Sequence, residues 1–513
     1  MPTIRKKQGS LLVIVVIFGF IMILSLTAIS SLLVTEHRLL RQKIAKEDAL
    51  QVAEAGLNYY RWRLAHNDDD LSAITEQAYY GPSGNLIGYY SVTTETTETA
   101  SYGARVTICH KPGTPAERTA IIPISALSAH LAHGDYEGNC GTTSSSNTGV
   151  IAITAVGWTD DYPNIQRTIK ARYSKPSLAQ YAFATNSNVW FGDTESLSGL
   201  VHSNGGIRMD GTCDSRMTSI KETYICGEEH GCAAAGEDKP GIWGTGIDAQ
   251  LWDYPVTDSV DFDVITVDLD TIKTAANASG EYFEPSTKYG YLITFSDNGT
   301  FDVRKVTKLE NPVWSYNGTA WVYDSISYKN TSNVGTYNIP SNGLIFVEDN
   351  VWIEGIIDGR ATLAAARLPD ADYEDANIYI QNDLTYATRD GVTVLGLIAQ
   401  NDIAIPLYSE DNLVIDAALL AQKGHVFRNC YGDGCYEDLP SSSYDIRNSI
   451  QIYGTIISNG VWTFSWVNYA GGPVISGYTT TQTTYDPYLL YAPPPSFPAE
   501  DEYEFISWEE INP

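Results

Sequence analysis

The sequence has few basic residues for its size. Its 513 residues include 32 lysines and arginines against 62 aspartates and glutamates, which gives a net charge of −30 at pH 7. A strongly negative chain repels the phosphates of nucleic acids and the headgroups of anionic membranes. We therefore expect no nucleic-acid partner and no attachment to an acidic membrane surface.

The sequence also lacks the common motifs of hydrolytic and nucleotide-binding sites. It contains no Gly-x-Ser-x-Gly elbow, His-Glu-x-x-His helix or phosphate-binding glycine loop. The candidates for paired catalytic carboxylates stand mostly at turn positions, where aspartate is common: Asp358, Asp402, Asp411 and Asp416. We expect a structural or binding protein and no enzyme. The alternative is a membrane-anchored β-helix enzyme that acts on polysaccharide.

Charge is absent from one long stretch near the N-terminus. Residues Leu11–Val34 carry none, and a helix of that length, at about 1.5 Å per residue, crosses the apolar core of a bilayer. The stretch is too long for a secretory signal and lacks its cleavage site. Arg5, Lys6 and Lys7 precede it and hold the N-terminus in the cytoplasm. The sequence predicts a single-pass membrane protein whose C-terminal domain lies outside the cytoplasm.

Proline is also absent from the next segment, Thr35–Leu64, which contains a single glycine. Most of its residues favour a helix. Its apolar residues recur mostly at steps of three and four, so they share one helical face: Leu40, Ile44, Ala49, Val52, Ala53, Leu57, Tyr60 and Leu64. One helix is therefore expected to continue from the membrane into an amphipathic stem.

This N-terminal region resembles that of PilX-like minor pilins of type IV pili. The likeness is carried by the basic leader ending in Gly9, the small Ser10, the apolar run and the phrase DALQVAEAGLNYYRWRL from Asp48. In that family prepilin peptidase cuts after the glycine. The resemblance implies cleavage between Gly9 and Ser10 at the inner membrane, and assembly with other pilin subunits at the cell surface or in a pilus.

One residue departs from the pattern of major pilins. They usually carry a glutamate as the fifth mature residue, and Ile14 holds that place here. In a filament this glutamate is thought to neutralise the N-terminal amine of an adjoining subunit. A subunit without it, carrying a bulky domain, is expected at a filament end, where it presents that domain for adhesion.

The rest of the chain shows no evident long helix and reads as mostly β. Its 34 tyrosines and 42 glycines accompany short β-branched runs separated by turn residues. The expected fold class is mainly β, with a long N-terminal pilin-like α-helix, a small β domain and a parallel β-helix-like solenoid with a large insertion. The expected domains are a leader 1–9, a stem helix 10–66, a small β domain 67–178 with a Cys/His insert 107–140, a β-helix-like domain 179–495 with an insertion at about 210–342, and a tail 496–513.

The solenoid is predicted from a repeat. Five segments share alternating apolar residues, a small residue, a polar turn and a second short strand; they begin at Ser196, Val351, Val392, Leu413 and Ile450. The small residues of the last four are about one or two multiples of roughly 20 residues apart: Gly355, Gly396, Ala417 and Gly454. Stacked coils would bury the inward residues. A β-sandwich with coincidentally similar strands is the alternative.

Seven cysteines lie beyond the membrane run, where disulfides persist. Cys430 and Cys435 are candidate partners across a tight loop, and Cys226 and Cys232 across another. The second pair is also a candidate for metal binding, with His230 and Cys213.

The insert at 107–140 has the ligand types that zinc accepts: Cys109, His110, His130, His133 and Cys140. A short helix that begins at Ser125 and ends at Gly134 would place the two later histidines on one face. The pattern resembles a small module found in bacterial extracellular proteins. A disulfide Cys109–Cys140 with structural histidines is the equal alternative, and no other cofactor is expected.

Two further features are candidates for ligand binding. Trp352, Trp462 and Trp466 are candidates for stacking on a surface polysaccharide, although strands favour aromatic residues in any case. The acidic turns HNDDD and SDNGTFD are candidates for calcium, but neither matches the spacing of a known calcium loop.

Overall fold

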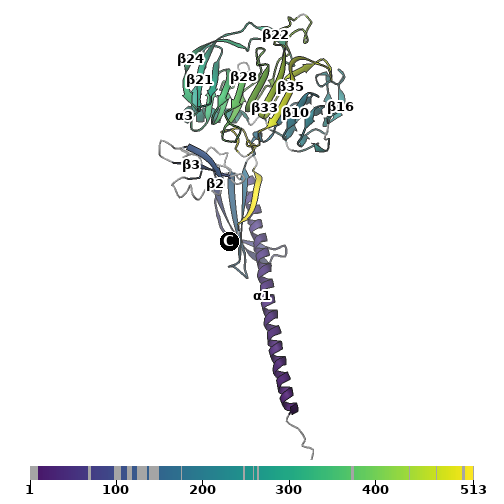
Figure 1. The fold of residues 1–513 in the computed structure, drawn as a ribbon, viewed down its shortest axis with the longest axis vertical. Coiled ribbons are helices and arrows are strands. Elements are labelled where there is room, and N and C mark those ends of the chain that lie inside the picture. The colour runs from purple at the N-terminus through teal and green to yellow at the C-terminus, as the bar shows by residue number, and fades with distance from the viewer. Residues whose placement is uncertain are drawn as a thin grey trace, which may run out of the picture. The chain divides into compact units, whose positions relative to one another are not determined.

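Figure 1 shows the computed structural model of the chain. It describes the chain from residue 10 onward, except for residues 67–70, 98–104, 112–117, 124–135, 138–149, 175, 247–248, 258, 261, 263–264, 371–374, 438, 470, 491, 500–502 and 512–513. The prediction of a mainly β chain with one long N-terminal helix and a large sheet-rich domain is confirmed. The chain divides into a stem unit, residues 1–97, 150–174 and 503–513, and a ladder unit, residues 98–149 and 175–502.

Helix α1 spans Ser10–His66 without a break, as predicted. In its first half the large apolar side chains from Val13 to Ile44 are 48–70% exposed. In its second half one stripe is buried, at steps that follow the helical turn: Ala45, Ala49, Val52, Ala53, Leu57, Tyr60 and Leu64. The packed face therefore begins at Ala45, and Leu40 and Ile44, which were expected on it, remain exposed.

A five-stranded antiparallel sheet covers the buried stripe of α1. Its order is β1 (Ile74–Tyr80), β2 (Leu86–Thr97), β6 (Val150–Thr159), β7 (Gln166–Ser174) and β36 (Glu504–Ile511). Val92, Ile153 and Ile169 are fully buried in the core between this sheet and the helix. The Asp-Pro-Asn turn at 160–165 joins β6 to β7, which is the hairpin that the sequence predicted.

Strand β36 differs from the expectation for residues 496–513, which was a tail. It pairs with β7, with Trp508 opposite Ala171. Ion pairs join Arg167 to Glu510 and Arg172 to Glu509 across the same two strands. Arg167 and Glu510 are 343 positions apart in the sequence, and no local sequence pattern predicts a strand pairing at that distance.

The ladder unit is built from short strands that pair in parallel and in register (Figure 1). Its paired strands are β8 (Phe183–Thr185), β10 (Glu195–Ser198), β11 (Val201–Ser203), β13 (Thr212–Cys213), β14 (Met217–Ser219), β18 (Trp252–Asp253), β19 (Glu281–Phe283), β20 (Tyr291–Ser296), β25 (Leu344–Val347), β26 (Val351–Ile357), β27 (Arg360–Ala365), β28 (Ile378–Tyr386), β29 (Val394–Ala399), β30 (Ile403–Ala404), β31 (Asn412–Ala421), β32 (Val426–Phe427), β33 (Ile446–Ser458) and β35 (Val474–Tyr485).

The chain enters this ladder in its middle. One row of strands has the spatial order β18, β14, β11, β8, β33, β31, β29, β27, β25, β19. The chain starts at β8, runs out to β18, resumes at the far end with β19 and returns to β33, which pairs with β8. Strand β35 lies in the same way between β33 and β10, and Figure 1 shows the yellow β35 beside the teal β10. The first strands of the ladder, β8 and β10, therefore pair with its last strands, β33 and β35.

The predicted stacking of small residues holds at one place only. Gly454 pairs with Ala417 as expected. Gly396 pairs with Ala418, one position further on, and Gly355 pairs with Leu384 of β28. The repeat segments predicted from the sequence did not include strand β28. They therefore matched strands that belong to different rows of the ladder.

The large insertion at 210–342 was also placed wrongly. Strands β13, β14 and β18 continue the ladder, and β19 and β20 pair with β25 and β26. Strands β13, β14, β18 and β19 have two or three residues and are too short to show alternation, which is why the sequence did not reveal them. The antiparallel excursion consists of β21 (Thr300–Leu309), β22 (Val313–Tyr316), β23 (Trp321–Asp324) and β24 (Tyr328–Asn338).

A second helix, α3 (Ile265–Ser279), was missed by the sequence analysis. Leu269, Ile272 and Ala276 are buried against the last strands of the ladder, at helical spacing that the sequence does contain. The helix packs against β19 and β25, at the end of the row of strands, where an open sheet edge would otherwise face water.

The remaining elements are small. They are β3 (Arg105–His110), β4 (Arg118–Pro123), β5 (Tyr136–Glu137), β9 (Val189–Phe191), β12 (Ile207–Met209), β15 (Thr223–Cys226), β16 (Glu237–Pro240), β17 (Ile242–Trp243), β34 (Ser465–Val467) and the 3-10 turns η1 (Leu178–Gln180), η2 (Glu228–His230) and η3 (Ala249–Leu251).

Candidate functional site

The exposed first half of α1 is the most unusual surface of the stem unit. It presents a continuous apolar surface with no charged side chain between Lys7 and Glu36. Two of its hydroxyls are satisfied within the helix, because Thr27 donates to the Ile23 carbonyl (3.0 Å) and Ser31 to the Ala28 carbonyl (2.8 Å). Within the described chain it is the one helix long and apolar enough to cross a membrane. Such a surface suits a bilayer or a bundle of similar helices.

The predicted processing site lies at the start of this helix. Ser10 is the first residue of α1, and Gly9 lies outside the described residues. Ile14 is 48% exposed on the apolar surface, and the first turn of α1 holds no acidic residue. Cleavage after Gly9 remains a prediction.

The Cys/His insert is described only in its strands. Cys109 and His110 end β3, which pairs with β4 and with β5. His130, His133 and Cys140 lie outside the described residues. Cys109 pairs with Tyr136 and Ile108 with Glu137, so β3 and β5 are neighbouring strands. The zinc site and the Cys109–Cys140 disulfide both remain predictions.

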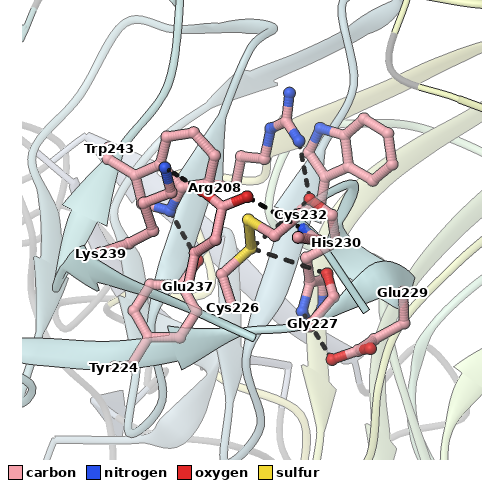
Figure 2. Close-up of a disulfide and its surroundings, with 12 residues drawn as sticks. Arg208, Tyr224, Cys226, Gly227, Glu229, His230, Cys232, Glu237, Lys239 and Trp243 are labelled. Atoms are coloured by element: carbon pink, nitrogen blue, oxygen red, sulfur yellow. Dashed lines mark hydrogen bonds and ion pairs between the residues drawn. A yellow bond between two sulfur atoms is a disulfide. The ribbon is translucent and has the colours of Figure 1, made fainter. Parts of the chain in front are cut away.

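The candidate pair Cys226 and Cys232 forms a disulfide around η2 (Figure 2). Cys213 lies apart as a buried free thiol, whose pKa is raised by burial. The alternative of a metal site built from these cysteines and His230 is therefore wrong, because two of its thiolates are joined to each other. No cluster of three metal-ligating side chains occurs among the residues that the structure describes.

Arg208 connects this disulfide loop to the rest of the ladder unit through ring contacts and hydrogen bonds (Figure 2). Its guanidinium lies 4.6 Å from the ring of Trp190 and 4.8 Å from that of Trp243. It donates hydrogen bonds to the Asp210 carboxylate and to the His230 carbonyl, both at 2.7 Å. His230 is 3% exposed, and burial lowers its pKa, so the ring is neutral at pH 7. This arrangement orders a loop and brings no reactive pair together.

A cleft of about 520 Å³ opens beside this loop, over the corners of successive ladder turns. The amides in its wall already have partners. Asn204 donates to Asn186 and to the Val260 carbonyl, both at 2.8 Å, and Asn186 donates to Asn459 at 2.9 Å. This asparagine row was missed, although the recurring Ser/Thr-Asn pairs at 185–186, 203–204 and 458–459 were its signal. The row stabilises the corner of the ladder.

Three of the four carboxylates that were weighed as catalytic candidates have structural partners. Asp416 is buried in β31, where it accepts bonds from Arg389 (2.8 Å) and from the Tyr386 amide (3.0 Å). Asp402 accepts a bond from the His425 amide (2.7 Å), and Asp411 from the Asn448 amide (3.1 Å). No bond of this kind is found for Asp358 in the described chain.

One buried carboxylate escaped the sequence analysis. Glu195 of β10 is 8% exposed, and burial raises its pKa to about 8 although the Gly192 amide donates to it (2.9 Å). At pH 7 this group is therefore protonated. It is the first residue of a four-residue strand, with no cation beside it in the sequence, and this position gave no signal of function.

The predicted aromatic residues are mostly in the core. Trp352 and Trp462 are 1% and 4% exposed, so the expectation that they stack on sugars is wrong. Trp352 lies in β26, whose first three residues are all buried, and Trp462 lies in the connection between β33 and β34. Trp466 is half-buried, and it lies beside the hairpin β22–β23, where Tyr316 meets its ring at 5.8 Å. The candidate pair Cys430 and Cys435 forms a disulfide next to the same hairpin.

Comparisons with known proteins give one structural neighbour. No protein-family model matches the chain, and no curated protein matches it. The crystal structure of the competence-associated pilin ComZ from Thermus thermophilus aligns over 91% of this chain and 97% of its own, at 10% identity and a TM-score of 0.27. A TM-score this low does not establish a shared fold, so the function must be argued from the chain's own residues.

Proposed function

We propose that this chain is a pilin-like structural subunit of a type IV pilus or a related filament, of the PilX-like minor class. It is anchored in the inner membrane by α1 before assembly and packs against other subunits through α1 afterwards. The ladder unit is the extracytoplasmic domain that it presents for adhesion or binding. The role is structural and not enzymatic.

The observation that carries this proposal is the division of α1. One unbroken helix carries no charge as far as Thr35, is exposed from Val13 to Ile44, and is packed on its own sheet from Ala45. A plain anchor needs only the first part, and a soluble domain only the second. Because one helix contains both parts, it supports a subunit whose α1 moves from a bilayer into a bundle of similar helices. Both environments accept the same apolar surface.

The alternative, an anchored polysaccharide-active enzyme, has less support. Three of its candidate carboxylates already have partners. Asp416 forms an ion pair with Arg389, and Asp402 and Asp411 accept hydrogen bonds from the backbone amides of His425 and Asn448. Release of reducing ends from polysaccharide by the full chain, sustained over many turnovers, would overturn the structural assignment.

The subunit assignment is tested in filaments sheared from cells that express the full chain. The chain is expected in the filament fraction with a mature N-terminus at Ser10, which mass spectrometry reads. Val16→Asp places a charge on the exposed surface of α1 (Val16 is 62% exposed) and should remove the chain from filaments. Glu54→Gln, on the exposed side of the packed half, should not. Absence of the native chain from filaments would contradict the proposal.

A further inference from the structure

The hairpin β22–β23 of the ladder unit has two unlike faces. Its antiparallel pairs place Trp314 opposite Tyr323 and Tyr316 opposite Trp321. Because side chains alternate along a strand, these four rings share one face, and the other face carries Val313, Ser315, Val322 and Asp324.

The polar face of this hairpin is the buried one. Ser315 is fully buried and Asp324 is 5% exposed, whereas Trp314 is 38% and Tyr323 is 70% exposed. The hydrophobic effect favours the opposite arrangement. Core formation therefore does not explain why the rings face outward.

The buried face has partners that hold the hairpin in this orientation. The Asn429 amide donates to Ser315 (3.1 Å) and to Asp324 (3.4 Å), and the Tyr431 hydroxyl donates to Asp324. Tyr316 and Cys430 exchange two backbone hydrogen bonds, of 3.0 and 2.8 Å. The Cys430–Cys435 disulfide closes the loop that supplies these partners. The rings are thus fixed before any ligand arrives, which removes an ordering cost from binding.

The rings form one continuous surface, here called the aromatic platform. Ring centroids lie 4.5 Å apart for Trp314–Tyr323, 6.5 Å for Trp314–Trp321 and 5.3 Å for Tyr316–Trp321. Two rings from other segments extend it, since Trp321 meets Tyr436 at 5.6 Å and Tyr316 meets Trp466 at 5.8 Å. Its members are Trp314, Tyr316, Trp321, Tyr323, Tyr436 and Trp466.

We propose that the aromatic platform is a binding surface for an uncharged polysaccharide segment. A pyranose ring has an apolar C–H face that stacks on an aromatic ring and hydroxyls that reach polar groups at the ring edge, and tyrosine and tryptophan offer both. The inference deepens the proposed function, because it names a ligand class for the domain that the subunit presents.

Size argues for a saccharide over a protein partner. Two strands of four residues cover on the order of 150 Å², at about 3.4 Å per residue and about 5 Å between strands. The two added rings raise this to about 300 Å² at most. A stable protein interface needs about 800 Å² on each partner, whereas a few sugar rings need no more than this surface.

Charge excludes an acidic saccharide. The chain carries a net charge of −30, and the charged residues nearest to Tyr436 in the sequence are Glu437 and Asp438. An anionic polymer would be repelled by both, whereas hydroxyl groups can donate hydrogen bonds to carboxylates. The six rings are spread over both strands of the hairpin and two further segments, so an extended neutral chain fits better than a single cation.

The test uses the full chain in detergent micelles and isothermal titration with cellohexaose, chitohexaose and maltohexaose. At least one of these probes is expected to bind, and the anionic polymers alginate and hyaluronate are not. Trp314→Ala combined with Tyr323→Ala should weaken binding at least tenfold. Trp314→Phe combined with Tyr323→Phe should retain most of it, because stacking survives.

Matched controls carry equally exposed rings elsewhere. Tyr289→Ala in the ladder unit (49% exposed) and Trp62→Ala in the stem unit (55% exposed) should bind as the native chain does. Lack of binding to all three neutral probes, equal binding by the alanine pair, or binding only to alginate or hyaluronate would overturn the proposal.

The two proposals fail separately. The Trp314→Ala, Tyr323→Ala chain should still enter sheared filaments, since its changes leave α1 intact. Filaments that contain the chain without saccharide binding would remove this inference alone. Saccharide binding by a chain that never enters filaments would remove the proposed function alone.

Discussion

Gly56 of helix α1 lies directly beneath the ring of Tyr90 on strand β2. A β carbon at position 56 would stand 2.7 Å from Cδ2 and 2.9 Å from Cγ of that ring. Gly157 of β6 approaches the helix in the same way, since a β carbon there would lie 2.4 Å from the Ala49 carbonyl oxygen. The small residues of the phrase Ala-Glu-Ala-Gly, 53–56, therefore let the sheet lie against the helix backbone.

Gly56→Leu is expected to destabilise the stem unit. The new side chain must displace the Tyr90 ring, and overpacking of this kind costs about 1–3 kcal/mol, which exceeds the gain of at most about 1 kcal/mol in helix propensity. The change in stability is measured by unfolding the detergent-solubilised chain in denaturant and following protease cleavage within the stem unit. Asn58→Leu introduces the same side chain on the exposed side and should be neutral. Equal stability of the two variants would contradict the close packing.

Ile14→Glu is expected to increase incorporation along the filament shaft. A carboxylate at the fifth mature position can pair with the N-terminal amine of a neighbour, and an unpaired charge in an apolar bundle costs several kcal/mol. Immunogold labelling should show the native chain at filament ends and the variant along the length. Ile17→Glu, equally exposed but three positions on, should not be incorporated more. Regular labelling of the shaft by the native chain would refute an end position.

Stability of the ladder unit is expected to fall as pH rises from about 5 to 8. Burial raises the pKa of Glu195 to about 8, well above its value in an unfolded chain, so the native state holds a proton that unfolding releases. The contribution of this group to the free energy of unfolding is fully present below its pKa in the unfolded chain. It is lost as pH rises through its pKa in the folded chain, by at most about 1.4 kcal/mol per pH unit.

Glu195→Gln isolates this effect, because glutamine keeps an acceptor for the Gly192 amide and does not titrate. Asp324, whose pKa burial raises to about 6, adds a dependence of the same sign in both chains. The difference in unfolding free energy between native and variant should therefore change between pH 5 and pH 8. A constant difference across this range would show that Glu195 is ionised in the folded chain.

Cys140→Ser is expected to loosen residues 107–140 and to leave the ladder folded. Strands β3, β4 and β5 pair only with one another among the described strands, so few hydrogen bonds connect them to the ladder. Hydrogen exchange of the two regions measures this, with Cys213→Ala as a control outside the insert. Zinc content and disulfide mapping of the native chain decide between the metal site and the Cys109–Cys140 bond. Loss of protection throughout the ladder would refute an independent insert.

The sequence by itself determined the elements whose causes are local. Helix α1 follows from propensity and from apolar residues at helical spacing, and the β6–β7 hairpin follows from its Asp-Pro-Asn turn. The pairs Cys226–Cys232 and Cys430–Cys435 are each six or fewer positions apart, so chain proximity made them candidates. The mainly β class follows from composition.

Only the tertiary structure decided which strands are neighbours. The pairing of β8 with β33 and of β7 with β36 joins segments hundreds of residues apart, and the direction of each side chain follows from that pairing. Trp352 is buried and Trp314 exposed, although each is the second residue of a strand that begins Val-Trp. A strand has two faces, and alternation alone does not say which of them will be covered, because the covering segment is supplied from elsewhere in the chain.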